Sequence, residues 1–257
     1  MCYEIGARPP LPPIKGGLAA QTRDLTLTAK DGNRFMAFLA RAASPTGAGM
    51  VILPDVRGLH SFYKELAERF AETGIDSVAV DYFGRTAGMG ARDDSFEYRS
   101  HVEKTVPQSI DQDVAAAIAC LRSEVGGSVR SVFTVGFCFG GSNSWRQSAT
   151  QPGLAGAIGF YGRPSRVQDV IVRMKAPLLL LIAGADQATP QEEFKAFDRQ
   201  LADAGVPHKM VVYPGAPHSF FDRSFAEHKE ACDDAWRQVL DFVTERAAQP
   251  AEPGAVR

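Results

Sequence analysis

Short apolar runs alternate along this chain with longer segments in which apolar residues recur at helical spacing. The runs at Met50–Pro54 and Pro177–Ala183 are continuous, which is typical of strands in a sheet covered on both faces. The strands predicted in this way are Met50–Pro54, Ile75–Asp81, Ser131–Phe137, Leu154–Tyr161, Pro177–Ala183 and Lys209–Tyr213. The predicted helices are Ser61–Thr73, Pro107–Glu124, a segment after Gly141 that continues to about Ala149, Pro190–Ala204, and Ala226–Arg246.

A hairpin is predicted before these elements, because Asp24–Ala29 and Arg34–Ala40 flank the turn residues Asp31-Gly32. Strands that alternate with helices then predict an α/β fold, a three-layer α/β/α sandwich around a mostly parallel sheet of about eight strands. Residues 86–105 carry mixed charge and little periodicity, and they fit a loop or a small lid. We find no composition shift and no internal repeat, so residues 21–247 are predicted to form a single domain.

The two ends of the chain differ from this domain in composition. Residues 1–20 contain four prolines and the pair Gly16-Gly17, which predict an extended arm with no core of its own. Residues 248–257 are predicted to be a flexible tail. The N-terminus lacks the apolar core of a signal peptide, and no apolar run approaches the ~18–20 residues of a membrane span, so we expect a cytoplasmic protein.

The overall charge gives no indication of a nucleic-acid or membrane partner, since the net charge is −2 and the pI is about 6.2. A small-molecule substrate and a monomer or homodimer are expected instead. The four cysteines are far apart, and no pair has metal-ligand spacing; they are Cys2, Cys120, Cys138 and Cys232. This pattern argues against a disulfide scaffold and a structural zinc site.

The segment around Cys138 has the pattern of a nucleophile elbow. A predicted strand, Ser131–Phe137, runs into Gly-x-Cys-x-Gly-Gly and then into a helix-compatible segment. A nucleophile must occupy a sharp, strained turn to stand clear of the sheet, so the residues two before and two after it lack a Cβ, as Gly136 and Gly140 do here. The N-terminus of the following helix favours a thiolate and a nearby oxyanion.

This segment has two other interpretations. A cysteine flanked by Phe137 and Phe139 in an apolar segment is often an inert core residue. A glycine-rich turn between a strand and a helix can also bind phosphate, but the spacing is not G-x-G-x-x-G and no Gly-Lys-Ser/Thr follows. Both nucleotide-binding patterns therefore fail.

Reactive residues follow several predicted strands, and sites in open α/β sheets form beyond the carboxyl ends of the strands. Asp55 follows the first long strand, and Cys138, Asp186 and His218 then follow in the order nucleophile, acid, base. His218 would accept the thiol proton and return it to the leaving group, while Asp186 would orient the imidazole. We expect the backbone N–H groups of Phe139 and Val56 to form the oxyanion hole.

The acid and the base also have possible structural roles. Asp186 could form a turn or cap a helix. His218 lies in a Gly/Pro-rich loop before Ser-Phe, which favours a functional role. His60 could begin a helix, and the remaining histidines lie in polar or helical contexts. The joint order of the three residues, each at the end of a strand, favours a catalytic triad.

The residues of the three motifs resemble a known family. Gly136-Phe-Cys-Phe-Gly-Gly, Gly-Ala-Asp186 and Ala-Pro-His218-Ser-Phe are similar to the dienelactone hydrolase family of α/β-hydrolases, from about Asp24 to the C-terminal helix. The cysteine at the elbow is the specific part, because it separates this family from serine esterases. The resemblance implies the α/β-hydrolase fold and hydrolysis of an enol-lactone or related ester through a thioester. It implies no metal or organic cofactor.

The resemblance also implies a thiol-activating acid after the first long strand. This residue is usually Glu in the family, and the matching position here holds Asp55, one methylene shorter. It interacts with the resting thiol in the family and helps to deliver the thiolate when substrate arrives. Asp55 is therefore a candidate for this role.

Two arginines bind the substrate carboxylate in the family, and Arg85 matches one of them. The position of the second holds Asp222, with Arg223 one position later, and Arg57 is a further nearby cation. Each guanidinium could pair with a carboxylate in two hydrogen bonds, or could instead form a structural ion pair. Tyr82 is a candidate for lining an apolar substrate pocket, or else a core residue.

Two other classes of function compete with a cysteine-dependent hydrolase. A redox or electrophile sensor would use Cys138 as an oxidisable thiol, and it would be favoured by a resolving cysteine nearby. Cys120 and Cys232, however, lie on predicted helices away from the strand ends. The third alternative is a non-catalytic binding protein, which the intact Cys-Asp-His order argues against.

Overall fold

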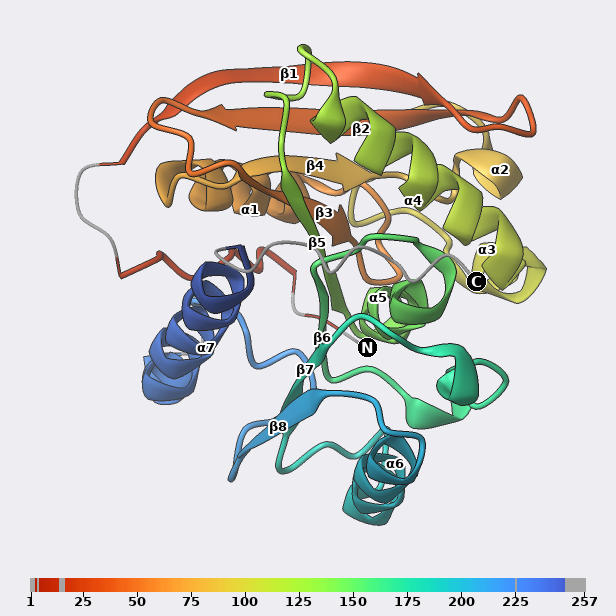
Figure 1. Ribbon diagram of the computed structural model, residues 1–257, viewed down its shortest axis with the longest axis vertical. Helices are drawn as coiled ribbons and strands as arrows, with labels where there is room; N and C mark the ends of the chain where they lie inside the picture. Colours follow the sequence, from red (N-terminus) through yellow and green to blue (C-terminus); the bar gives the residue numbers. More distant parts are fainter. Residues whose placement is uncertain (1–2, 4, 14–16, 225, 248–257) are drawn as a thin grey trace, which may run out of the picture.

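A twisted sheet forms the centre of the molecule (Figure 1), of which the computed structural model describes residues 3, 5–13, 17–224 and 226–247. Eight strands lie in the order β1-β2-β4-β3-β5-β6-β7-β8. β1 (Ala19–Thr28) and β2 (Arg34–Ala42) form an antiparallel hairpin at one edge, and β2 also pairs antiparallel with β4 (Asp76–Val80). The remaining strands are parallel: β3 (Ala48–Leu53), β5 (Ser131–Phe137), β6 (Gly156–Phe160), β7 (Leu178–Ala183) and β8 (His208–Tyr213).

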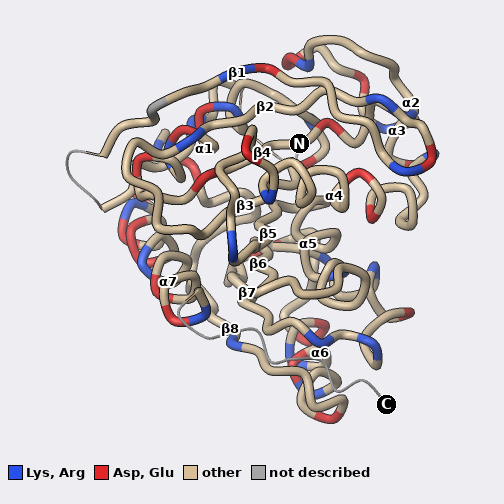
Figure 2. Tube along the Cα trace, turned by 45° about the horizontal axis from the view of Figure 1, so that its top comes forward, with Lys and Arg blue, Asp and Glu red and all other residues tan. Residues whose placement is uncertain are grey.

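Helices cover both faces of the sheet and enclose two apolar cores. α1 (Ser61–Glu72) and α7 (Lys229–Ala247) pack on one face, where Met50, Phe133 and Trp236 are among the buried residues. The helices on the other face are α4 (Pro107–Arg122), α5 (Phe139–Thr150) and α6 (Gln191–Asp203). Charged residues lie on these outer helices and on the hairpin, while the strands β3, β5, β6 and β7 carry none (Figure 2). None of the helices in the described residues is long and apolar enough to cross a membrane.

The register of the parallel strands brings the predicted functional segments to one edge. Leu53, the last residue of β3, pairs with Gly136 near the end of β5, and Phe137 pairs with Phe160 at the end of β6. Ala183 ends β7 opposite Tyr213, the last residue of β8. The loops that follow β3, β5, β6, β7 and β8 therefore leave the sheet side by side, as expected for a functional site in this topology.

The predicted α/β sandwich with a mostly parallel sheet of eight strands is confirmed. Its details differ at a few places. β1 begins at Ala19, inside the segment predicted as the N-terminal arm. Residues 86–105, predicted as a loop or lid, contain the second half of the short helix α2 (Gly84–Ala87) and all of α3 (Arg99–Lys104). The last helix begins with a 3₁₀ turn, η3 (Ala226–His228). The predicted tail, residues 248–257, lies outside the described residues.

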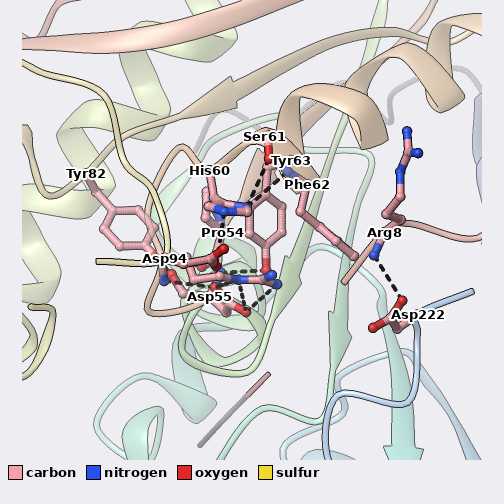
Figure 3. Close-up of polar contacts among 11 residues, drawn as sticks. Arg8, Pro54, Asp55, His60, Ser61, Phe62, Tyr63, Tyr82, Asp94 and Asp222 are labelled. Carbon is pink, nitrogen blue, oxygen red and sulfur yellow. Dashed lines mark hydrogen bonds and ion pairs between the residues drawn. The ribbon is translucent and has the colours of Figure 1, made fainter. Parts of the chain in front are cut away.

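The described part of the N-terminal arm packs along the domain. Trp236 of α7 donates its indole N–H to the carbonyl of Pro10 at 3.1 Å, and the backbone N–H of Arg8 donates to Asp222 Oδ1 at 3.0 Å (Figure 3). Arg223 N–H donates in turn to the Arg8 carbonyl at 3.0 Å. These bonds and the buried Pro9 and Pro10 fix the described part of the arm on the α7 side.

A buried ion pair attaches the hairpin to the helix behind it. Arg85 of α2 donates from Nε and Nη2 to the two carboxylate oxygens of Asp113 on α4, at 2.9 and 2.8 Å. Its Nη1 also donates to Asp31 in the β1–β2 turn, at 2.6 Å, and Asn33 donates to Asp113 at 3.2 Å. The Asp113 side chain is fully buried, so this arginine is its main compensation for lost hydration.

Replacement of Arg85 by methionine is expected to lower the free energy of unfolding by about 3 kcal/mol at neutral pH, because the buried Asp113 carboxylate loses its cation. Burial already raises the pKa of Asp113, and the arginine opposes that rise. A carboxyl whose pKa is raised by folding destabilises the fold above that pKa, so the difference between R85M and wild type should shrink as the pH falls. Urea unfolding at several pH values measures this difference in unfolding free energy.

Arg173 provides the matched control, since it is exposed and donates only to the Asp169 carbonyl in the described part of the chain. Arg173→Met should change the free energy of unfolding by less than about 0.5 kcal/mol. A loss in R85M that is equal at all pH values would contradict the assignment of the effect to Asp113.

Candidate active site

Cys138 occupies the turn between β5 and α5 with a backbone that few non-glycine residues adopt. Its φ is 53° and its ψ is −112°. The Cys138 N–H donates to the Phe160 carbonyl at 3.0 Å, and the Cys138 carbonyl accepts from Gly141 at 3.0 Å. Such strained backbone is held only where the surrounding structure determines it. The predicted strand–turn–helix is therefore present, with Cys138 at the N-cap of α5.

Close packing of glycines makes this turn possible. A Cβ on Gly136 would lie 1.9 Å from the Gly140 carbonyl oxygen. A Cβ on Gly140 would lie 2.1 Å from the carbonyl oxygen of Leu53 and 2.2 Å from that of Pro54. The first turn of α5 thus rests against the end of β3, as close as two backbones can approach.

His218 and Asp186 are brought together although they are 32 residues apart in the chain. The distance between His218 Nδ1 and Asp186 Oδ2 is 2.8 Å, and the carboxylate of Asp186 is fully buried. The other oxygen, Oδ1, accepts from the Ala188 N–H at 2.7 Å. His218 Nε2 is buried and has no hydrogen-bond partner in the described residues. A carboxylate at Nδ1 places the ring proton there and leaves Nε2 as the basic nitrogen.

Tyr161 links the histidine to the elbow. Its ring lies 5.0 Å from the His218 ring, and it follows β6 directly beside the strand of the nucleophile. Burial raises the pKa of Tyr161 well above its usual value, and the nearby Tyr63, Asp55 and Cys138 contribute to the rise. Cys138 itself is only half-buried, so the elbow reaches solvent.

Two backbone amides are available beside the thiol. Phe139 is the first residue of α5, so its N–H has no partner inside the helix. Neither this amide nor that of Val56 has an acceptor recorded among the described residues. The loop of Val56 is fixed on both sides, because the Asp55 N–H donates to the Tyr63 hydroxyl at 2.9 Å and the Tyr82 hydroxyl donates to the carbonyls of Pro54 and Asp55 (Figure 3). Tyr82 is completely buried and anchors this loop.

Asp55 is paired with Arg57 inside the protein. Arg57 donates from Nε and Nη2 to the two carboxylate oxygens at 2.8–3.1 Å, and its N–H donates to Asp55 Oδ1 at 2.9 Å. The guanidinium lies 4.3 Å from the Tyr3 ring centroid and 4.8 Å from that of Phe62. Both oxygens of Asp55 are therefore engaged with a cation, and any interaction of Asp55 with the thiol would compete with Arg57.

The other two arginines singled out in the sequence are also bound to acids. Arg85 is held by Asp113 and Asp31, and Arg223 pairs with Glu65 of α1 at 2.9 Å. Asp222 is buried, and it accepts hydrogen bonds from the backbone N–H groups of Arg8 and Ser224. The structure thus places each of these residues in a structural contact.

Three neighbours of the site were not singled out in the sequence as binding residues. Arg166 lies over the Phe139 ring, with 4.9 Å between its guanidinium carbon and the ring centroid. Tyr3 of the arm stacks on Arg57. His60 caps α1 by accepting from the Phe62 N–H, and its Nε2 lies 3.4 Å from Asp94 of the loop before α3 (Figure 3). Tyr3 and Asp94 come from segments whose polar sequences gave no signal of where they dock.

The elbow after β5 and the Asp186–His218 pair after β7 and β8 define the fold class as an α/β-hydrolase. Solved structures share this fold. A dienelactone hydrolase-like promiscuous phosphotriesterase from metagenomic libraries superposes with a TM-score of 0.74 and 21% identity, covering 88% of this chain and 98% of that one. An acylaminoacyl peptidase of Pyrococcus horikoshii matches with a TM-score of 0.69 and 14% identity, covering 93% of this chain and 43% of its own.

The particular family follows from the sequence. The model of the dienelactone hydrolase family matches residues 35–247, and the chain belongs to this family of carboxylic ester and lactone hydrolases. A Yersinia pestis relative with the name "Putative carboxymethylenebutenolidase" is 27% identical over 235 residues, covering 86% of this chain and 87% of its own length. A Saccharolobus solfataricus protein of the same name is 28% identical over 254 residues, covering 83% and 95%. The resemblance inferred from the three motifs is confirmed.

Replacement of Gly140 by alanine is expected to lower the free energy of unfolding by about 3 kcal/mol, because the new Cβ would overlap the carbonyl oxygens of Leu53 and Pro54. The Val56 loop would also be pushed away from α5. Gly90→Ala is the control, since the nearest atom to its Cβ would be 3.8 Å away, and a change below about 0.5 kcal/mol is expected. Thermal unfolding measures both. Equal melting temperatures for G140A and wild type would contradict this packing argument.

Proposed function

We propose that the protein hydrolyses an enol-lactone or a related carboxylic ester through a thioester on Cys138. The Asp186–His218 hydrogen bond of 2.8 Å, with Nε2 left as the basic nitrogen, carries this proposal. The left-handed turn that exposes Cys138 at the N-terminus of a twelve-residue helix supports it. A helix N-terminus stabilises the thiolate and the charge that develops on the acyl oxygen.

In the acylation step, His218 Nε2 removes the proton of the Cys138 thiol, and the thiolate attacks the acyl carbon. The negative charge that forms on the acyl oxygen is stabilised by the N–H groups of Phe139 and Val56. The bond from the acyl carbon to the ester oxygen then breaks, and His218 gives its proton to that oxygen. In a lactone the leaving oxygen stays attached to the acyl chain.

In the deacylation step, water replaces the leaving group. His218 Nε2 removes a proton from this water, and the resulting hydroxide attacks the thioester carbon. The carbon–sulfur bond breaks, the carboxylic acid product leaves, and the thiol regains its proton from His218. Asp186 holds the imidazole in one orientation through both steps and offsets the positive charge of the protonated ring.

The role of Asp55 as a thiol-activating acid remains a prediction. Its carboxylate already accepts from Arg57, so the acid could act on the thiol only if this pairing changed. The cytoplasmic location and the monomeric or homodimeric state, both expected from the sequence, also remain predictions.

A redox sensor is the second candidate function, and the thiols in the described residues favour it less. Burial raises the pKa of Cys120, and it raises that of Cys232 to about 11. A thiol with a raised pKa forms little thiolate at neutral pH and resolves an oxidised partner slowly. No disulfide joins the cysteines in the described part of the chain, where Cys120, Cys138 and Cys232 are all thiols.

Cys138→Ala is expected to lower the rate of hydrolysis of a p-nitrophenyl ester and an enol-lactone by at least about a thousandfold, because the nucleophile is removed. The fold should persist, since alanine can take the place of the cysteine with a small loss of packing. Cys120→Ala is the control and should retain the wild-type rate, because Cys120 lies on α4. Full activity in C138A would remove the nucleophile assignment.

A further inference from the structure

The arginines expected to bind substrate are committed to carboxylates of the protein. Arg57 is paired with Asp55, Arg85 with Asp113 and Asp31, and Arg223 with Glu65. Each would have to leave an ion pair before its guanidinium could make two hydrogen bonds to a substrate. Breaking a buried pair is costly, so these residues are poor carboxylate receptors in this arrangement.

The cavity beside Arg57 leaves no room for a substrate. Its volume is about 10 Å³, and its walls include Tyr3, Ala7, Arg57, Tyr161 and Asp222. This space holds about one water molecule. The N-terminal arm, through Tyr3 and Ala7, forms part of the wall of this cavity, so the space beside Arg57 does not admit a substrate.

Arg166 lies beside the elbow, over Phe139, and differs from the arginines above. Arg166 is an exposed residue. Its guanidinium carbon lies 4.9 Å from the ring centroid of Phe139, the residue directly after the expected nucleophile. No carboxylate lies within ion-pair distance of it among the described residues. A guanidinium stacked on an aromatic face keeps its N–H edges free for a planar anion.

The position of Arg166 is fixed relative to Cys138. It ends the short 3₁₀ helix η1 (Pro164–Arg166), and its N–H donates to the Arg163 carbonyl at 3.1 Å. Arg163 N–H donates to Ser142 Oγ at 2.7 Å, and that hydroxyl donates to the Arg163 carbonyl at 3.1 Å. Ser142 belongs to the first turns of α5, so η1 is attached to the helix that carries the thiol.

The charges of the site act on Arg166 as well. Although Arg166 as a whole is exposed, its guanidinium packs on Phe139, and this partial loss of hydration is the largest influence that lowers its pKa; the positive charge of Arg163 lowers the pKa further. A negative charge on Cys138 would act in the opposite direction and raise the pKa of Arg166. A negatively charged ligand beside the thiol would relieve the repulsion between Arg163 and Arg166.

We propose that Arg166 is the residue that recognises the substrate carboxylate implied by the family resemblance, and that this carboxylate lies on the Phe139 side of the elbow. The proposal rests on the proposed function, and it places the anion-binding group on η1 instead of at Arg57, Arg85 or Arg223. A planar carboxylate would accept two hydrogen bonds from the free edge of the Arg166 guanidinium.

Alkylation of Cys138 tests this without requiring turnover. Iodoacetate and iodoacetamide react with the same thiolate, but only iodoacetate carries a carboxylate. We compare the ratio of the iodoacetate rate to the iodoacetamide rate. In the wild type this ratio should be higher at Cys138 than for a free thiol in solution, and Arg166→Gln should lower the ratio at Cys138 by about tenfold. Peptide mass spectrometry assigns the modified cysteine. Arg166→Lys, which keeps the charge but loses the planar fork, should give an intermediate ratio.

Arg173→Gln is the matched control, because it removes the same charge from the neighbouring 3₁₀ helix η2 (Ile171–Arg173) and should leave the ratio unchanged. An unchanged ratio in R166Q would overturn the proposal. An equal fall in both rates would overturn it too, since Arg166 would then act on the thiolate alone. The same comparison with the mono-p-nitrophenyl ester of glutaric acid and p-nitrophenyl butyrate should show the same selective loss in kcat/KM.

The experiments distinguish failure of the proposed function from failure of the Arg166 assignment. If C138A retained esterase activity, the nucleophile assignment would fail, whatever the alkylation ratio. If C138A were inactive and R166Q kept the wild-type ratio, only the assignment of Arg166 would fail.

Discussion

The contact between the first turn of α5 and the end of β3 is the constraint on which the site depends. Gly140 lies against the carbonyls of Leu53 and Pro54, where even a methyl group would overlap them. This contact sets the two amides of the expected oxyanion hole, Phe139 and Val56, on facing segments of backbone. It also requires the chain to turn within one residue, and Cys138 takes the left-handed conformation that this turn demands.

Some charged groups around the elbow form ion pairs within the protein, and others have no such partner among the described residues. The pair of Asp55 and Arg57 fixes the loop after β3 and, through Tyr3, docks the N-terminal arm over it. Ion pairs of this kind rigidify a site, because each guanidinium is held by hydrogen bonds of fixed geometry. Arg166 stands apart, since its cation is supported by an aromatic ring and leaves its polar edge to a ligand. In the proposal above, binding and architecture therefore fall to different arginines.

The fold could be predicted from the sequence, and so could the order of the elbow, Asp186 and His218, because these features appear in short stretches of the chain. Apolar runs predict buried strands, and the reactive residues directly follow those strands. It could not predict the partners of the arginines. Whether Arg85 meets a substrate or Asp113 depends on how α4 packs behind the hairpin, which is a contact between distant segments. The docking of Tyr3 and the position of Arg166 over Phe139 are likewise tertiary contacts with no sequence period. For the same reason Asp222 gave no sign that it would hold the arm.

The most direct test of the account is to trap the covalent intermediate. The wild-type protein would be mixed with p-nitrophenyl acetate, quenched in acid during turnover, and analysed by intact and peptide mass spectrometry. A thioester on Cys138 predicts one acetyl group on the peptide that contains this cysteine, and neutral hydroxylamine should release it. An acetyl group on any other residue during turnover would contradict it.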